Sequence, residues 1–408
     1  MVKQGYKQTE IGTIPEDWSC VRFGEKVKIY RGGSPRPIQN YITTSSNGIN
    51  WIKIGDVGEN DKYIRSTQEK IIPEGVSKSR EVHVGDFILS NSMSFGRPYI
   101  LDIDGCIHDG WLTIQDYKNT FATEYLYYLL SSDKVYQQYL GMAAGSSVKN
   151  LNKDKVSSLK VIYPDIPEQE RIAEALSDVD SMISSLEKLI EKKKAVKQGA
   201  MQELLTGKKR LPGFTGEWVY MELGKYGSLM KETINPQLYS FEYFWEYSMP
   251  AFDEVRTPIK QKGAAMHSNR TVICGKVLLF NKLNVRQKRI WLIDQCRDRS
   301  VCSSEFLPYK SDAINLELLS QILYTDKVTL EFIGMSTGTS NSQKRITPDA
   351  FLGYKVYLPI NEKEQAAIAN VFSCMDNEIE ALEQKLEKTR QIKQGMIQQL
   401  LTGKIRLM

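Results

Sequence analysis

The chain contains one long segment twice, and this repeat constrains its fold more than any other feature of the sequence. Residues 169–211 align without a gap with residues 365–407, and about half of the aligned residues are identical. Asp165 and Asn361 each stand three residues before a Glu, a spacing typical of the start of a helix. Each copy ends in Leu-Leu-Thr-Gly, and a glycine often follows the last turn of a helix. The repeat therefore predicts two equivalent helices.

Both predicted helices carry apolar residues at alternating steps of four and three, which is the heptad pattern of a coiled-coil seam. The seam residues are Ile172, Leu176, Val179, Ile183, Leu186 and Ile190 in the first copy and Ile368, Phe372, Met375, Ile379, Leu382 and Leu386 in the second. A helix from Ile172 to Leu204 is about 50 Å long and must bury its apolar stripe. We expect the two helices to pair with each other. The chain could reach a parallel or an antiparallel pairing, and two equivalent units favour the antiparallel one.

The segments between the helices predict two further globular regions, since 408 residues exceed the usual size of one domain. β-rich runs alternate there with helical patterns. The runs are Val82–Ser90, Tyr99–Ile103, Thr271–Asn281 and Arg289–Ile293, and the helical patterns are Thr123–Leu140 and Leu316–Phe332. We predict an α+β protein with two mixed α/β lobes, joined and spaced by an antiparallel coiled coil with pseudo-twofold symmetry. The predicted bounds are 1–163 and 211–359 for the lobes, and 164–210 and 360–408 for the helical spacers.

Positive charge is concentrated in one part of the second lobe. The whole chain has a formal charge of only +5, which by itself indicates no nucleic-acid partner. The segment from Val255 to Ser300 holds eleven Lys and Arg against two Asp, a net of +9. Such a cluster could bind a polyanion by releasing the counterions of its phosphates, or it could be an ordinary solvated face. Charge alone favours neither interpretation.

The familiar signatures of catalysis are missing from the sequence. The three histidines and six cysteines show no metal-ligand spacing, and the phosphate-loop pattern of ATP-binding proteins does not occur. Asn235-Pro236-Gln237 is a poor match to the motif of amino-methyltransferases. We therefore expect no metal or cofactor in this chain. No apolar run is long enough to span a membrane and no signal peptide is apparent, which favours a cytoplasmic protein with reduced thiols.

Over essentially its whole length, the sequence resembles a known family, the specificity subunits of type I restriction–modification enzymes. The resemblance rests on Thr9-Glu10-Ile11-Gly12-x-Ile14-Pro15-x-x-Trp18, on Gln169-Glu170-x-Ile172-Ala173, on Lys197-Gln198-Gly199-x-Met201-Gln202-x-Leu204-Leu205-Thr206-Gly207, and on the second copies of the repeats. It implies two target recognition domains, each of which recognises one half of a split DNA site. It also implies that the coiled coil sets the gap and docks two methyltransferase (modification) subunits.

The resemblance also implies where cofactors and further partners belong. S-adenosylmethionine is expected in the modification subunits, and ATP with Mg²⁺ in the restriction subunits of the full complex. The chain itself is expected to be a non-catalytic subunit that binds double-stranded DNA. Two alternatives remain: a coiled-coil adaptor that holds two protein partners without recognising DNA, and a stand-alone enzyme with an unfamiliar active site.

Candidate contact residues follow from the side chains that bind phosphates or base edges. The predicted DNA-binding residues are Arg31, Arg36, Asn91, Ser92, Arg97, Lys149 and Asn150 in the first lobe, and Arg256, Lys260, Lys262, Arg270, Asn281, Lys282, Arg286, Lys288, Arg289, Lys344 and Arg345 in the second. Polar residues off the seam that are identical in both repeats suggest two docking sites for two copies of one partner. They are Gln198, Gly199, Gln202, Thr206 and Gly207, with Gln394, Gly395, Gln398, Thr402 and Gly403. Alternatively, these residues only cap and stack the helix ends.

Overall fold

The computed structural model describes residues 4–58, 61–91, 95–143, 150–338 and 344–407. The chain divides into two compact units. The first unit holds residues 1–187 and 384–408, and the second holds residues 188–383. The two units share the long helices: α4 (Ile166–Leu204) and α10 (Glu362–Leu400) each contribute one part to either unit. No helix among the described residues is long and apolar enough to cross a membrane.

Both long helices begin and end as the repeat predicts. The Asp165 carboxylate accepts a hydrogen bond from the backbone N–H of Glu168, at 3.1 Å, and the Asn361 side chain accepts one from the N–H of Lys363, at 2.9 Å. Just after the helices, Gly207 and Gly403 adopt the left-handed conformation, with φ values of +67° and +69°. This conformation is open to glycine at no steric cost, and it ends both helices in the same way.

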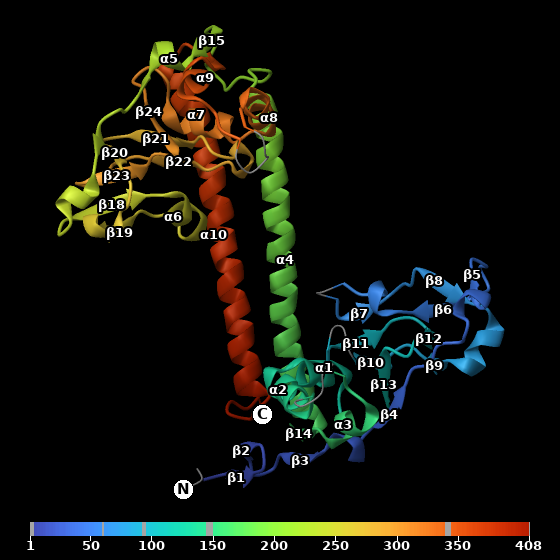
Figure 1. The fold of residues 1–408 in the computed structure, drawn as a ribbon. Helices are drawn as coiled ribbons and strands as arrows, with labels where there is room; N and C mark the ends of the chain where they lie inside the picture. Colours follow the sequence, from blue (N-terminus) through green and yellow to red (C-terminus); the bar gives the residue numbers. More distant parts are fainter. Residues whose placement is uncertain (1–3, 59–60, 92–94, 144–149, 339–343, 408) are drawn as a thin grey trace. The chain divides into compact units, whose positions relative to one another are not determined.

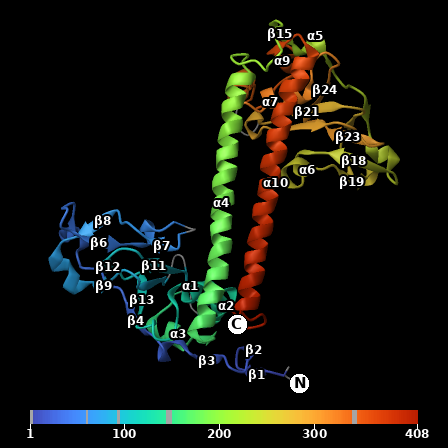
Figure 2. The ribbon, with the colours of Figure 1, turned by 180° about the vertical axis from the view of Figure 1, so that it is seen from behind.

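The two helices run antiparallel within each unit. In the first unit, Lys393 lies 2.6 Å from Asp180, and Arg390 lies 2.7 Å from Glu187. Residue numbers thus rise along one helix as they fall along the other. In the second unit, Lys197 lies 2.5 Å from Asp376, which repeats the Lys393–Asp180 pair 196 positions away. Figures 1 and 2 show the corresponding helix segments side by side within each unit. The predicted antiparallel pairing is confirmed.

The first lobe holds two five-stranded sheets, with strand orders β4-β13-β10-β11-β7 and β5-β8-β6-β12-β9, and two two-stranded sheets, β1-β2 and β14-β3. The strands are β1 (Tyr6–Thr9), β2 (Gly12–Pro15), β3 (Ser19–Arg22), β4 (Lys28–Arg31), β5 (Ile42–Thr43), β6 (Ile49–Ile52), β7 (Tyr63–Ile64), β8 (Glu69–Ile71), β9 (Arg80–Val82), β10 (Phe87–Ser90), β11 (Pro98–Leu101), β12 (Gly105–Ile107), β13 (Trp111–Gln115) and β14 (Lys160–Tyr163).

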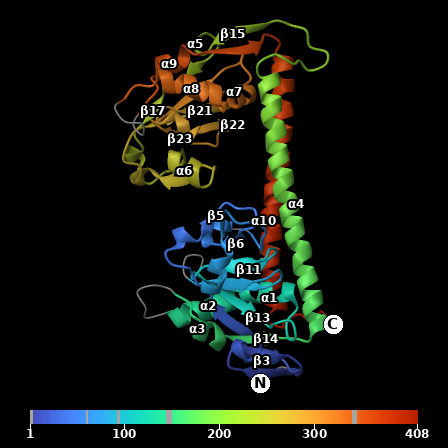
Figure 3. The same cartoon turned by 90° about the vertical axis from the view of Figure 1, so that its right-hand side faces the viewer.

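Three helices of the first lobe, α1 (Thr123–Ser131), α2 (Asp133–Ala143) and α3 (Lys153–Ser158), complete it, and Figure 3 shows them beside β13 and β14. One hydrophobic core joins this lobe to the long helices. Trp18, Phe87 and Tyr125 of the lobe share it with Leu176 of α4 and Leu400 of α10. Burial of large apolar side chains at this junction fixes the lobe on the helix ends of its own unit.

The second lobe repeats this plan with a four-stranded sheet, β16-β24-β21-β22, a five-stranded sheet, β17-β20-β23-β18-β19, and the pair β15-β25. Its strands are β15 (Trp218–Glu222), β16 (Ser228–Leu229), β17 (Thr233–Ile234), β18 (Tyr243–Tyr247), β19 (Ile259–Lys262), β20 (Arg270–Val272), β21 (Val277–Asn281), β22 (Ile290–Ile293), β23 (Ser300–Ser303), β24 (Phe306–Lys310) and β25 (Lys355–Pro359). Its helices are α5 (Leu223–Tyr226), α6 (Met249–Glu254), α7 (Leu316–Leu323), α8 (Asp326–Met335) and α9 (Pro348–Leu352). Leu204, Ile368 and Phe372 of the long helices enter its largest core.

The predicted α+β fold class is confirmed, while several predicted elements are divided. The pattern Thr123–Leu140 forms two helices that meet at Ser132, whose backbone is extended there. Leu316–Phe332 divides in the same way at Thr325, whose hydroxyl accepts a hydrogen bond from the N–H of Val328 and caps α8. A local cap can break a helix without disturbing the apolar periodicity on either side, so periodicity alone does not reveal the break.

Candidate nucleic-acid interface

A buried ion pair lies where each lobe meets the long helices, and it joins the start of one long helix to the segment just after the other. The two ion pairs are copies of each other. In the first unit the Arg406 guanidinium donates to both carboxylate oxygens of Glu168, at 2.7 and 2.8 Å. In the second unit Arg210 donates to both carboxylate oxygens of Glu364, at 2.5 and 2.6 Å. The glutamates are only 2% and 0% exposed. The fork geometry of arginine matches a carboxylate, and such bidentate pairs are strong and directional.

A tryptophan of each lobe completes these contacts. The indole N–H of Trp18 donates to Glu168, and the indole N–H of Trp218 donates to Glu364. The sequence predicted these glutamates as members of a capping pattern, but each carboxylate accepts from an arginine just after the other long helix and from a tryptophan of the lobe. We call each of these sets, Trp18–Glu168–Arg406 and Trp218–Glu364–Arg210, an anchor. The two anchors occupy corresponding places in the two units.

A glutamine next to each anchor glutamate fixes the start of a helix in its lobe, α1 in the first lobe and α7 in the second. Gln169 accepts a hydrogen bond from the backbone N–H of Ala122, just before α1, and donates to the carbonyls of Thr120 and Pro164. Gln365 accepts from the N–H of Asn315, just before α7, in the same way. Each side chain is buried, so these bonds are made away from water, where an unpaired amide would be costly. The supports of the two lobes are therefore equivalent.

The basic segment of the second lobe is partly neutralised by carboxylates that come mostly from elsewhere in the chain. Five of its eleven cations have such a partner: Arg270 with Glu246, Lys276 with Asp294 and Glu317, Lys288 with Asp326, Arg289 with Asp253, and Arg299 with Glu242. Hydrogen bonds from Arg289 and Lys288 lower the pKa values of Asp253 and Asp326. The other six cations form no ion pair with a carboxylate among the described residues. They are Arg256, Lys260, Lys262, Lys282, Arg286 and Arg297.

Lys260 and Lys262 of β19 share one face with two aromatic rings of β18, and Arg297, from the connection between β22 and β23, stacks on one of these rings. Tyr243 pairs with Lys262, and Trp245 pairs with Lys260, across the two antiparallel strands. The Lys260 ammonium lies 5.2 Å from the Tyr243 ring centre, and the Arg297 guanidinium lies 3.9 Å from that of Trp245. We call these five residues the aromatic–basic face. Strand β19 is an edge strand, which leaves this face at the border of its sheet.

The remaining predicted contacts of the second lobe fall into three groups. Arg256, whose guanidinium lies 4.9 Å from the Phe252 ring centre, and Arg286 are exposed, and Lys282 and Lys344 are half-buried. Arg345 lies 3.2 Å from Glu305, while Arg270, Lys288 and Arg289 belong to the ion pairs above. Asn281 is buried, and its amide donates to the carbonyl of Glu305 at 3.4 Å. The burial of Asn281 favours a supporting role over direct contact with a base.

In the first lobe, three predicted residues converge on Asp109. Arg31 donates to the Asp109 carbonyl at 3.3 Å, and Arg36 lies 3.6 Å from its carboxylate. Asn91 donates to the same carbonyl at 3.0 Å but is itself buried. A hydrogen bond from the Ser34 hydroxyl lowers the pKa of Asp109. Both arginines are exposed, so the first lobe presents two cations that contact the same aspartate, one at its carbonyl and one at its carboxylate.

The other predicted residues of the first lobe are dispersed. Arg97 lies 5.5 Å from the Tyr99 ring centre, and Asn150 is exposed. Ser92 and Lys149 lie outside the described residues. Sequence reasoning did not name Tyr243, Trp245 or Arg297 as contacts. The alternation Tyr-x-Trp opposite Lys-x-Lys could have indicated a shared strand face, but the pairing of the two strands was needed to see it.

The seam residues and the helix-end residues differ in exposure. All twelve predicted seam residues are buried or half-buried. Of the predicted partner-binding residues, Gln198, Gly199, Gln202, Thr206, Gln394, Gly395 and Gln398 are exposed, and Gly207, Thr402 and Gly403 are not. Gly403 lies against Pro15, and Gly207 lies against the ring of Trp218. These two glycines therefore serve the helix ends themselves, as the alternative interpretation held.

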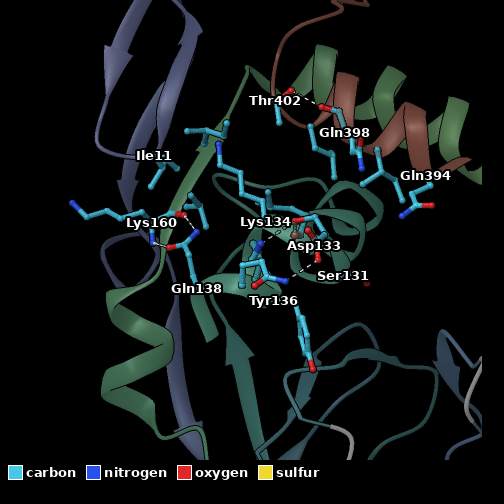
Figure 4. Close-up of a pocket in the computed structure, with 18 of the residues that line it drawn as sticks. Ile11, Ser131, Asp133, Lys134, Tyr136, Gln138, Lys160, Gln394, Gln398 and Thr402 are labelled. Carbon is cyan, nitrogen blue, oxygen red and sulfur yellow. Dashed lines mark hydrogen bonds between the residues drawn. The ribbon is translucent and has the colours of Figure 1, made fainter. Parts of the chain in front are cut away.

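A pocket of about 670 Å³ adjoins the exposed residues in the first unit. Figure 4 shows Gln394, Gln398 and Thr402 of the α10 end on one side of it, and Asp133 and Lys134 of α2 on another. Burial lowers the pKa of Lys134. No group of three or more His, Cys, Asp or Glu side chains that could hold a metal ion occurs in the described part of the chain.

Comparison with known proteins shows similarity to this kind of subunit. Residues 15–198 match the family described as type I restriction modification DNA specificity domain. The MjaVIII type I restriction enzyme specificity subunit of Methanocaldococcus jannaschii is 24% identical over 99% of this chain and 97% of its own length.

Two solved structures have a similar fold. The HsdS subunit from Thermoanaerobacter tengcongensis has a TM-score of 0.51 at 17% identity and covers 99% of this chain and 100% of its own. The S subunit of a type I restriction-modification system from M. genitalium has a TM-score of 0.57 at 13% identity and covers 94% of this chain and 96% of its own. In its matched domain, in its full-length relative and in its fold, the chain is therefore similar to the specificity subunits of type I restriction–modification systems.

Proposed function

We propose that this chain is the non-catalytic subunit that gives a type I restriction–modification complex its DNA sequence specificity, and that it acts in the cytoplasm. Each lobe recognises one half of a bipartite, asymmetric site in double-stranded DNA, and the paired helices set the gap between the halves. One observation carries the proposal: two lobes with different exposed faces stand on equivalent anchors, Glu168 with Arg406 and Glu364 with Arg210. Equivalent supports with unlike faces suit a site whose halves differ.

Exposed cations support DNA as the ligand of both lobes. Arg31 and Arg36 of the first lobe, and Lys260, Lys262 and Arg297 of the second, are exposed. Lys and Arg that contact phosphates fix the register of a protein on the duplex, and side chains that reach base edges specify the sequence. Cations held by stacking on aromatic rings rather than by carboxylates keep their full charge for phosphate binding.

The exposed helix ends support the docking of two modification subunits. Gly199 and Gly395 lie inside long helices, where glycine costs about 1 kcal/mol relative to alanine. A Cβ atom at either position would meet nothing within 4 Å, so packing within its own unit does not require glycine. A small residue on an exposed helix face allows the backbone of a partner to approach closely. We further propose that S-adenosylmethionine binds the modification subunits, and ATP with Mg²⁺ the restriction subunits of the full complex.

Modified-base sequencing of the host DNA, with this gene intact and deleted, tests the proposal. We expect adenine methylation to be lost at one asymmetric split motif, and to return when the gene is restored. Replacing the segment from Val255 to Ser300 with that of a relative should then change one half of the motif only. Loss of both halves would contradict independent lobes. If methylation is unchanged while the neighbouring methyltransferase is expressed, the adaptor interpretation replaces this one.

A further inference from the structure

A short segment of the second lobe exposes large apolar side chains next to the aromatic–basic face. The 3-10 helix Pro236–Tyr239 and the turn that follows it lead directly into β18. Phe241 is 90% exposed and Leu238 is 78% exposed, and Tyr239 between them is also exposed. We call these three residues the apolar tip. Scattered single apolar residues are normal on a surface, but three within four positions form an unusual local concentration.

The backbone of the apolar tip is fixed on both sides. The N–H of Gly263 donates to the Glu242 carbonyl at 2.9 Å, and the N–H of Ala264 donates to the Ser240 carbonyl at 3.2 Å. A Cβ atom on Gly263 would lie only 2.2 Å from the Pro236 carbonyl oxygen, so this approach requires glycine. The segment therefore presents its apolar side chains from a supported backbone, and their exposure follows from the fold rather than from a loose loop.

The neighbouring charges indicate what covers the apolar tip. Tyr243 begins β18 two residues after Phe241, and the Lys262 ammonium lies 5.6 Å from its ring centre. No carboxylate among the described residues pairs with Lys260, Lys262 or Arg297. Protein–protein interfaces are depleted in lysine at their centres, whereas DNA-binding surfaces combine phosphate-binding cations with apolar wedges or stacking rings. The charge around the tip is therefore complementary to duplex DNA.

We propose that the apolar tip is a wedge, in which Phe241, supported by Leu238, inserts at a base step of the half-site that the second lobe recognises. This inference rests on the proposed function and extends it. Lys260 and Lys262 bind the flanking phosphates, and the inserted side chain unstacks the step and bends the duplex. Because pyrimidine–purine steps deform most easily, the wedge selects sequence through deformability at a step that no polar side chain reads.

The test uses the complex of the full chain with its modification subunits. The probe is a duplex carrying the motif found by methylation sequencing, with 2-aminopurine placed in turn at each step of the second half-site. The native complex should raise 2-aminopurine fluorescence at one step, since unstacking relieves its quenching. Phe241→Ala should abolish this rise and weaken binding about 5- to 150-fold, the range measured for loss of a stacked side chain. Phe241→Trp should restore both.

Two further variants separate the outcomes. Tyr220→Ala removes another exposed aromatic side chain of the same unit, 70% exposed, and should change neither readout. The double variant Lys260→Ala/Lys262→Ala should weaken binding but keep the fluorescence rise at saturating protein. If Phe241→Ala binds and unstacks like the native complex, the wedge is wrong and the proposed function stands. If Phe241→Ala impairs assembly with the modification subunits without DNA, the tip is a protein interface. If the native complex does not bind the motif, the proposed function itself fails.

Discussion

The two units of this protein agree where each lobe meets the helices and differ where each lobe meets solvent. Glu168 with Arg406, and Glu364 with Arg210, are copies of one buried contact. On the exposed faces, the first lobe gathers its arginines around Asp109, whereas the second lobe stacks cations on Tyr243 and Trp245 without a carboxylate. The contrast indicates that the supports fulfil a common requirement, while each exposed face is adapted to its own ligand sequence.

The largest expected effect comes from a charge placed in the seam at corresponding positions. Leu186→Asp should lower the free energy of unfolding by at least about 3 kcal/mol, because it buries an unpaired carboxylate. Leu382→Asp should cost less, since Leu382 is only half-buried. Thermal unfolding and size-exclusion chromatography with the modification subunits measure both effects.

An exposed position on the same helix supplies the control for the seam variants. Leu189→Asp introduces the same charge at a residue that is 39% exposed, and should stay within about 0.5 kcal/mol of the parent. If Leu186→Asp assembles with its partners as the parent does, the helices are not the element that spaces the lobes.

The anchors themselves give the second prediction. Glu364→Gln should destabilise the second unit by about 2 kcal/mol, because the two charged oxygens that accept from Arg210 are replaced by one neutral amide oxygen and an NH2 group. Glu168→Gln should cost less in the first unit, since Arg406 retains Asp17 at 2.7 Å. Urea unfolding followed by tryptophan fluorescence reports both, because Trp18 and Trp218 are members of the two anchors. Glu170→Gln, at an exposed position, is the control, and equal losses in both units would refute the difference.

The third prediction concerns the exposed faces of the lobes. It is tested by measuring how the DNA-binding constant changes with salt concentration. Arg297→Ala should reduce the slope of log K against log salt by about 0.9, the contribution of one phosphate contact. Arg36→Ala should reduce it by less, because Asp109 already offsets part of the Arg36 charge. Arg289→Ala is the matched control in the second lobe, since this arginine is held by Asp253. A full reduction for Arg289→Ala would mean that its ion pair opens on binding.

The smallest expected effect depends on pH. A hydrogen bond from Arg406 holds the pKa of Asp17 below 3.8, so the folded state favours the ionised carboxylate. The stability that this adds is present at neutral pH and is lost as the pH falls through the lowered pKa of Asp17. Because Asp17 is largely exposed, Asp17→Asn should cost less than about 1 kcal/mol at pH 7 and a smaller amount near pH 3. Urea unfolding at both values checks this, and Asp178→Asn should be neutral at both.

Local features of the fold and the pairing of the repeated helices could be predicted from the sequence, whereas the other long-range contacts could not. The helix ends at Asp165 and Gly403 followed from short patterns, and the antiparallel pairing from the repeat. The aromatic–basic face depends on β19 pairing with β18, and the sequence between them carries no signal of that register. Likewise, Lys288 is held by Asp326, 38 positions away, so the net charge of a segment overstated what it exposes. Asn91 and Asn281 are polar in sequence but buried by their neighbours.

The ion pairs along the helix seam have a consequence for any titration of this protein with salt. Part of the contact between the two helices consists of ion pairs, which dissolved salt screens. They are Lys193–Glu378, Lys194–Glu383 and Arg390–Glu187. Raising the ionic strength therefore weakens the pairing of the two helices as well as the binding of the lobes to DNA phosphates. An apparent count of released counterions would include both events, and would overestimate the number of phosphates that the lobes touch.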